Sequence, residues 1–154
     1  MGQYFTNDNS IPSKLVKTRA VVLNNSFIFY TDNGVFSKDG LDFGSRLLLE
    51  NIPLTEIGES LLDVGCGYGV FGIILNKILG VKVTMCDVNR RALHLAEKNI
   101  KENKCSDCSV IESSCYQNIN SKYSTIITNP PIRAGNKVVY EILEGAKDYL
   151  LPGG

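Results

Sequence analysis

The chain has 154 residues, 44% of them hydrophobic, and its 16 basic and 16 acidic side chains cancel to a formal net charge of zero at pH 7. A chain of this size can bury one core, so we expect a single domain over residues 1–154. The balanced net charge therefore gives no indication of a polyanionic partner. A polar N-terminus and the lack of an apolar run of membrane-spanning length predict a soluble, cytoplasmic protein without a membrane partner.

Residues 1–59 are predicted to form a β-rich N-terminal part. Residues 19–23 and 26–31 are rich in β-branched and aromatic side chains, and the Asn24-Asn25 dipeptide between them tolerates positive φ. This pattern predicts a β-hairpin. A helix should follow, because Asp42 can cap it. The apolar positions of this helix would be Leu47, Leu48 and Ile52.

Residues 60–154 alternate between strand and helix patterns, which predicts an α/β fold with a doubly wound, mostly parallel sheet. The first strand runs up to Asp63, and the later strands are expected at residues 81–86, 109–112 and 124–128. Helices are expected at Val70–Leu79, after a cap at Asn89, and over residues 138–150. His94 falls off the apolar stripe of the second helix, so we expect it to face solvent.

The pattern stops after the fourth strand and its helix, so the sheet looks truncated. The fourth strand would then be a long apolar edge, which folded monomers normally cover. Three candidates remain for the cover: the N-terminal hairpin, a partner chain in an oligomer, or a C-terminal segment that is missing from this sequence.

The stretch Leu-Leu-Asp63-Val-Gly-Cys-Gly-Tyr-Gly-Val70 reads as strand, tight turn and helix. Gly65, Gly67 and Gly69 alternate along the turn, and glycine is required where the backbone takes positive φ or closely approaches a ligand. The turn also opens onto a helix N-terminus, which favours electron-rich ligand groups. A plain turn would not need three alternating glycines, so we expect a ligand here.

Two ligand classes fit this turn. Gly67-x-Gly69-x-x-Gly72, with Asp87 further on, matches the dinucleotide fingerprint. Asp63 argues against it, because a pyrophosphate at the end of this strand would meet negative charge and a cationic ligand would not. As Asp-x-Gly-x-Gly-x-Gly, the stretch resembles motif I of the S-adenosylmethionine-dependent methyltransferases, whose cofactor carries an ammonium and a sulfonium. We favour the second interpretation.

Polar residues follow the next two strands. Asp87 ends the second strand, where open α/β sheets place ligand contacts, and its carboxylate can accept both hydrogen bonds of a ribose diol. The alternative is a loop-capping aspartate. Ser113 and Ser114 end the third strand and could meet the far end of an adenosine, or could be plain turn serines.

Asn129-Pro130-Pro131 follows the fourth strand. Two prolines stiffen the backbone, so the Asn129 amide and the Pro130 carbonyl can both point into a cleft and accept from one NH₂ group. An amine held in line with an electrophilic methyl needs no strong base, and such positioning lowers a barrier by several kcal/mol. A stiff turn without chemistry is the alternative.

Four motifs occur in the order of one known family: Gly34-Val-Phe-Ser37, Leu41-Asp-Phe-Gly-Ser45, Asp63-Val-Gly-Cys-Gly-Tyr-Gly69 and Asn129-Pro-Pro-Ile132-Arg-Ala-Gly135. Over roughly residues 15–154 the chain resembles the RsmC-type ribosomal RNA guanine-N2 methyltransferases. The resemblance implies an S-adenosyl-L-methionine cofactor, transfer to guanine N2 in ribosomal RNA, and an unstacked base. It implies cofactor contacts from Asp63, Gly65, Cys66, Gly67, Asp87, Val88, Ser114, Phe36 and Ser45. It also implies catalytic roles for Asn129, Pro130 and Pro131.

The sequence departs from this family at Ser114, where an acidic residue often stands, and at Ile132, where many amino-methyltransferases have an aromatic residue. Two alternatives therefore stay open. One is a protein glutamine methyltransferase, whose motif usually ends in tyrosine and against which Ile132 counts. The other is an inactive cofactor-binding or assembly fragment of the same fold.

Five cysteines and no secretory signal predict reduced thiols. Cys105-x-x-Cys108 could be half of a zinc site or a redox pair, but a structural zinc site needs a second pair of ligands. We therefore expect incidental cysteines and no metal.

Overall fold

The computed structural model describes residues 14–32, 49–129 and 135–154. Its main element is a parallel four-stranded sheet with strand order β5-β4-β3-β6. The strands are β3 (Ser60–Val64), β4 (Lys82–Asp87), β5 (Cys108–Glu112) and β6 (Thr125–Thr128). The predicted parallel α/β sheet is therefore confirmed, with strand ends shifted by one residue.

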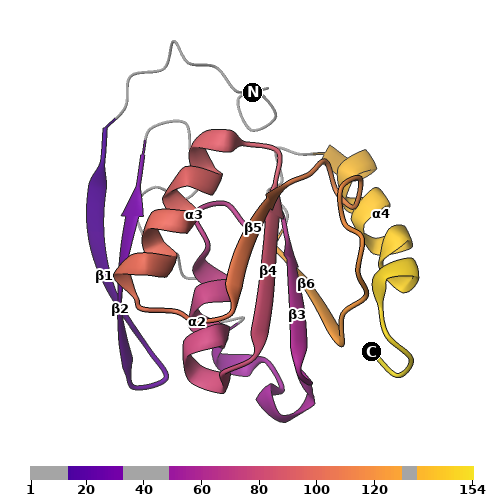
Figure 1. The fold of residues 1–154 in the computed structure, drawn as a ribbon, viewed down its shortest axis with the longest axis horizontal. Helices are drawn as coiled ribbons and strands as arrows, with labels where there is room; N and C mark the ends of the chain where they lie inside the picture. Colours follow the sequence, from indigo (N-terminus) through magenta and orange to yellow (C-terminus); the bar gives the residue numbers. More distant parts are fainter. Residues whose placement is uncertain (1–13, 33–48, 130–134) are drawn as a thin grey trace.

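Helices cover both faces of this sheet, as a doubly wound fold requires (Figure 1). On one face lie α2 (Val70–Leu79) and α3 (Arg90–Glu102). On the other lies α4 (Gly135–Gly145), which is followed by the 3₁₀ helix η4 (Ala146–Tyr149). A short 3₁₀ helix, η2 (Leu54–Glu56), precedes β3. No helix among the described residues is long and apolar enough to cross a membrane.

The helix bounds follow local sequence signals. Helix α2 has the predicted bounds, and α3 is capped as expected, because Ala92 N–H donates to Asn89 Oδ1 at 3.1 Å. His94 is exposed, as predicted. The last helix was predicted as one element, but the structure ends the α-helix at Gly145 and continues as η4. A Cβ at Gly145 would lie 2.9 Å from the Tyr116 ring, so only glycine allows this close approach.

The N-terminal hairpin forms a sheet of its own, with β1 (Val16–Val22) antiparallel to β2 (Asn25–Thr31). Its turn is Leu23-Asn24 with φ of 50° and 64°, so the predicted Asn24-Asn25 turn was wrong by one residue. Two positive φ values are what a two-residue hairpin turn of type I′ needs. A one-residue slip reverses the faces of a strand, and the observed register buries Phe27 and Phe29.

The hairpin packs on the outer side of the α2–α3 layer, away from β6 (Figure 1). The hairpin, one of the three candidates for covering the edge of the sheet, therefore does not cover it. Among the described strands, β6 pairs with β3 alone. A groove of about 230 Å³ runs beside it, lined by β6, α4 and the last residues of the chain.

Candidate functional site

The register of the sheet brings three of the predicted positions together. Val64 pairs with Cys86 on one side and with Thr128 on the other. Gly65, Asp87 and Asn129 are the residues that follow these three. Neighbouring strands lie about 4.8 Å apart, so the three positions lie side by side at the carboxyl end of the sheet. Asn129 is exposed there, directly after β6.

The glycine loop, residues 65–69, leaves β3 and enters α2. Gly65, Gly67 and Gly69 have φ of 74°, 58° and 99°, a region that favours glycine. Gly65 N–H and Cys66 N–H both donate to Cys86 O at 2.9 Å, which anchors the start of the loop to β4. No described atom lies within 4 Å of where a Cβ on Gly67 would be, so the backbone is open to a ligand at this point.

Asp63 lies beneath the loop with 1% of its surface exposed. Oδ2 accepts from Gly72 N–H at 3.2 Å, and Oδ1 is buried with no hydrogen-bond partner among the described residues. Burial raises the pKa of Asp63 to about 7; the Gly72 N–H opposes this rise and the charge of Asp87 adds to it. A buried acceptor without a donor is costly, so the site fits a ligand that brings a donor or a positive charge.

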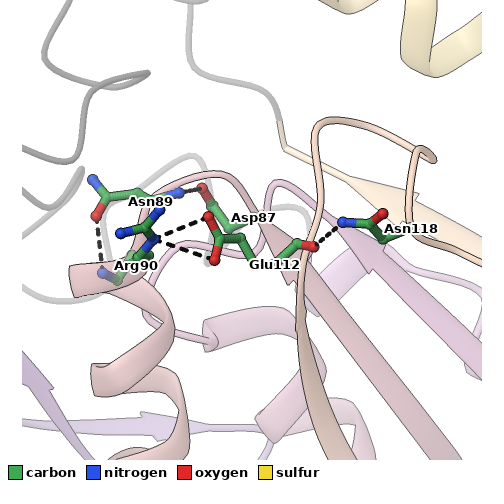
Figure 2. Close-up of polar contacts among 6 residues, drawn as sticks. Asp87, Asn89, Arg90, Glu112 and Asn118 are labelled. Carbon is green, nitrogen blue, oxygen red and sulfur yellow. Dashed lines mark hydrogen bonds and ion pairs between the residues drawn. The ribbon is translucent and has the colours of Figure 1, made fainter.

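Asp87 is 2% exposed and is held by two backbone groups. Oδ2 accepts from Gly67 N–H at 2.8 Å. Oδ1 accepts from Asn89 N–H at 2.9 Å (Figure 2). The same carboxylate thus fixes the glycine loop to the end of β4.

A cavity of about 80 Å³ opens beside these residues, between the strand ends and α4. It is lined by Gly65, Asp87, Val88, Ser114, Cys115 and Glu141, among others. Val88 and Ser114 are thus brought to the predicted site. Ser113 also lines it, but its Oγ donates to Cys115 O at 2.8 Å and accepts from Asn118 N–H, which makes it a turn serine.

Cys115 and Glu141, which bring titratable side chains to the lining, were missed by sequence reasoning. The thiol of Cys115, at the start of a turn, hydrogen-bonds to Glu141 on α4; burial, followed by this contact, raises the pKa of Cys115 to about 12. The helical pattern over residues 138–150 predicted which side chains are buried. Nothing in that pattern indicates that the helix lies against the turn that follows β5.

The remaining predicted residues have different outcomes. Cys66 is buried, its thiol donates to Gly67 O at 3.4 Å, and burial raises its pKa, so it is a neutral packing group in the loop. Phe36, Ser45, Pro130 and Pro131 lie outside the described residues. Cys105 and Cys108 hydrogen-bond to each other at the opposite end of the sheet, and no three metal-ligand side chains cluster among the described residues.

An acidic residue beneath a glycine loop, and a second one at the tip of the next parallel strand, define a nucleoside-binding α/β protein. The family model "Methyltransferase small domain" matches residues 26–154. The chain therefore belongs to the methyltransferase small domain family, whose fold and cofactor are those of S-adenosylmethionine-dependent methyltransferases.

Among the relatives is the uncharacterized protein YbxB of Bacillus subtilis, 38% identical over 98% of this chain and 77% of its own length. Ribosomal RNA small subunit methyltransferase C of Mannheimia succiniciproducens is 39% identical over 82% of this chain and 39% of its own. The structure of Thermus thermophilus 16S rRNA N2 G1207 methyltransferase (RsmC) with AdoMet and guanosine has a TM-score of 0.84 at 26% identity. It covers 93% of this chain, which spans only 41% of the RsmC chain.

Proposed function

We propose that this protein transfers a methyl group from S-adenosylmethionine to an exocyclic amine, and that the amine is guanine N2 in ribosomal RNA. The observation that carries the proposal is the register Val64–Thr128. This register supports placing the Asn129 amide next to Gly65, at the carboxyl end of the sheet, where the cofactor would lie. The names of the relatives, which act on ribosomal RNA, support the choice of substrate.

The cofactor fits the charges of the site. The unpartnered Oδ1 of Asp63 and the open backbone at Gly67 would receive the cationic methionine end. Asp87, whose carboxylate lies at the end of the neighbouring strand β4, would accept the ribose hydroxyls. Val88 and Ser114 would line the side of the base. When bound, S-adenosylmethionine supplies a methyl group on a positively charged sulfur.

The part of the chain after β6 would hold the amine. The Asn129 side-chain oxygen and the Pro130 carbonyl are acceptors, so they can bind the two protons of an NH₂ group and orient the nitrogen lone pair. Asn129 has no acidic or basic group, so it positions the amine and does not abstract a proton. Methyl transfer leaves a positive charge on the nitrogen, which makes its N–H far more acidic, so the proton can leave afterwards to water without a strong base.

The test combines binding and transfer. Calorimetry with S-adenosylmethionine should show one site in the wild type and at least tenfold weaker binding in Asp87→Ala, because two backbone donors and the ribose lose their acceptor. Asn129→Ala should leave the Kd within about twofold and lower transfer to unmethylated ribosomal RNA by about 100-fold or more. Glu112→Gln is the control, since this carboxylate pairs with Arg90 on the surface at 3.1 Å.

Absence of cofactor binding in the wild type would contradict the proposal and favour the inactive fragment. Transfer to protein glutamine, with ribosomal RNA untouched, would replace the substrate and keep the reaction class. Calorimetry reads the first outcome, and a radiolabelled methyl group in fractionated cell extract reads the second.

A further inference from the structure

Asn99 is a fully buried asparagine on α3, on the side of the helix that faces the hairpin. Its Oδ1 accepts from Tyr30 N–H at 2.7 Å, and its Nδ2 donates to Tyr30 O at 3.1 Å. The amide therefore pairs with β2 as a neighbouring strand would. The same Nδ2 also donates to Tyr68 O at 2.9 Å. Three of its four hydrogen-bonding positions are thus in use.

The bond to Tyr68 reaches the middle of the glycine loop. Tyr68 O belongs to the peptide between Tyr68 and Gly69, and glycines with positive φ stand on both sides of Tyr68. Glycine allows many backbone conformations, so such a peptide keeps one orientation only if something holds it. Asp87 holds the N–H of Gly67 from β4, and Asn99 holds the carbonyl of Tyr68 from α3.

Asn103, one helical turn further, offers a natural comparison. Its Oδ1 accepts from Ile28 N–H at 3.0 Å and its Nδ2 donates to Ile28 O at 2.8 Å, the same pairing two residues along β2. Its third bond, at 2.9 Å, goes to Asn99 O within the helix and not to the loop. The two asparagines therefore dock the hairpin in the same way and differ in their contact with the glycine loop.

We propose that Asn99 is a positioning residue for the cofactor: its amide fixes the Tyr68 carbonyl, and the hairpin in turn fixes the amide. A second contact supports the link, since the rings of Phe29 and Tyr68 pack edge to face at 5.9 Å. The hairpin is then a support for the glycine loop, although it lies outside the main sheet. The inference rests on the proposed function, because it assumes that this loop receives S-adenosylmethionine.

Asn99→Ala and Asn103→Ala form the matched pair for the test. Amide hydrogen exchange is first compared in the cofactor-free protein. We expect Asn99→Ala to speed exchange at Gly67 and Gly69 by about tenfold, the effect of losing one hydrogen bond to a buried carbonyl. Asn103→Ala should speed exchange at Ile28 and change the two loop amides by less than about twofold. Equal effects of both variants on the loop would overturn the inference.

Cofactor affinity gives the second measurement. Asn99→Ala should weaken the binding of S-adenosylmethionine by about tenfold. The binding of 5′-methylthioadenosine, which lacks the amino-acid end, should weaken by less than about threefold. A general loss of folding would weaken both ligands equally and would count against positioning. Wild-type protein that binds neither ligand would refute the proposed function, while the exchange experiment would still decide the role of Asn99.

If Asn99→Ala does not fold, the wild type supplies the test, because coupling between two sites is reciprocal. Addition of S-adenosylmethionine should then slow exchange of Tyr30 N–H, which bonds to Asn99, more than that of Ile28 N–H, which bonds to Asn103. Equal protection of the two amides would overturn the inference.

Discussion

Asp63 and Asp87 lie on adjacent parallel strands, and both are buried, with 1% and 2% of their surface exposed. Backbone N–H groups satisfy both carboxylate oxygens of Asp87, whereas Asp63 keeps one oxygen without a donor among the described residues. Their charges repel, which adds to the rise in the pKa of Asp63. Two acidic groups this close favour a ligand that brings positive charge between them.

We predict that cofactor binding depends on pH through Asp63. A cation prefers the ionised carboxylate, and with a pKa of about 7 the free protein holds this group mostly protonated at pH 6. Affinity should therefore rise by up to about tenfold per pH unit below pH 7 and level off above it. Calorimetry at pH 6 in buffers of different ionisation enthalpy should detect the release of close to one proton.

Asp63→Asn is the control for this experiment, since it removes the titrating group and leaves any titration of the ligand itself. The variant should bind weakly and show no proton release from the protein. An unchanged pH profile in Asp63→Asn would assign the dependence to another group.

The same pKa predicts the pH dependence of stability without cofactor. The folded-state pKa of about 7 lies above the ordinary 3.8, so between these values the folded protein binds more protons than the unfolded chain. The free energy of unfolding should then fall as pH rises from about 4 to 7 and stay low above 7. Asp63→Asn should be more stable than wild type at pH 8, by on the order of 1–2 kcal/mol after the cost of an unpaired amide. Urea unfolding of wild type and Asp63→Asn at pH 5 and pH 8 measures both effects. A wild type that is more stable at pH 8 than at pH 5, with no change in stability caused by Asp63→Asn, would contradict the assignment of this pKa to Asp63.

Gly72 sets how closely α2 approaches the sheet. A Cβ there would lie 2.6 Å from Sδ of Met85 and 2.9 Å from Cγ1 of Val83, both fully buried. Gly72→Ala should therefore lower the free energy of unfolding by about 1–3 kcal/mol, although alanine is the better helix former. In a Met85→Ala background the same substitution should cost much less, and chemical denaturation of the four proteins of this cycle measures the difference. Additive costs would show that Met85 is not the obstacle.

The cysteines should differ in reactivity. The hydrogen bond from the Cys108 thiol lowers the pKa of half-buried Cys105, and the charge of Lys77 adds to the effect. Burial raises the pKa of Cys66 and, to about 12, that of Cys86. Since the thiolate is the nucleophile, iodoacetamide at pH 7.5 should label Cys105 first. Mass spectrometry of the labelled peptides checks the order, and Cys108→Ala should slow the labelling of Cys105. Labelling of Cys66 in the folded protein at the same rate would contradict this prediction.

Local patterns predicted most of the fold. Helix α2 was predicted with its bounds, because the glycines before it and Gly80 after it punctuate an apolar run. The hairpin was predicted correctly, but its turn was wrong by one residue. Leu23 adopts positive φ, and only the packing of Phe27 and Phe29 into the core shows this. The hairpin also lies on the helix layer and not on the edge of the sheet. No periodicity in the sequence encodes that choice.

For the candidate site, the sequence by itself determined the residues at or next to the ends of three strands: Asp63 with its glycines, Asp87 and Asn129. A strand, a tight turn and a helix are local events, and their signals lie within about ten residues. Only the tertiary structure decided that Asp63 keeps an oxygen without a donor in the described part of the chain, that Glu141 reaches the cavity, and that Asn99 joins the hairpin to the glycine loop. These contacts join residues far apart in the chain, and they follow from how parallel strands and their crossovers pack, which residue types do not specify.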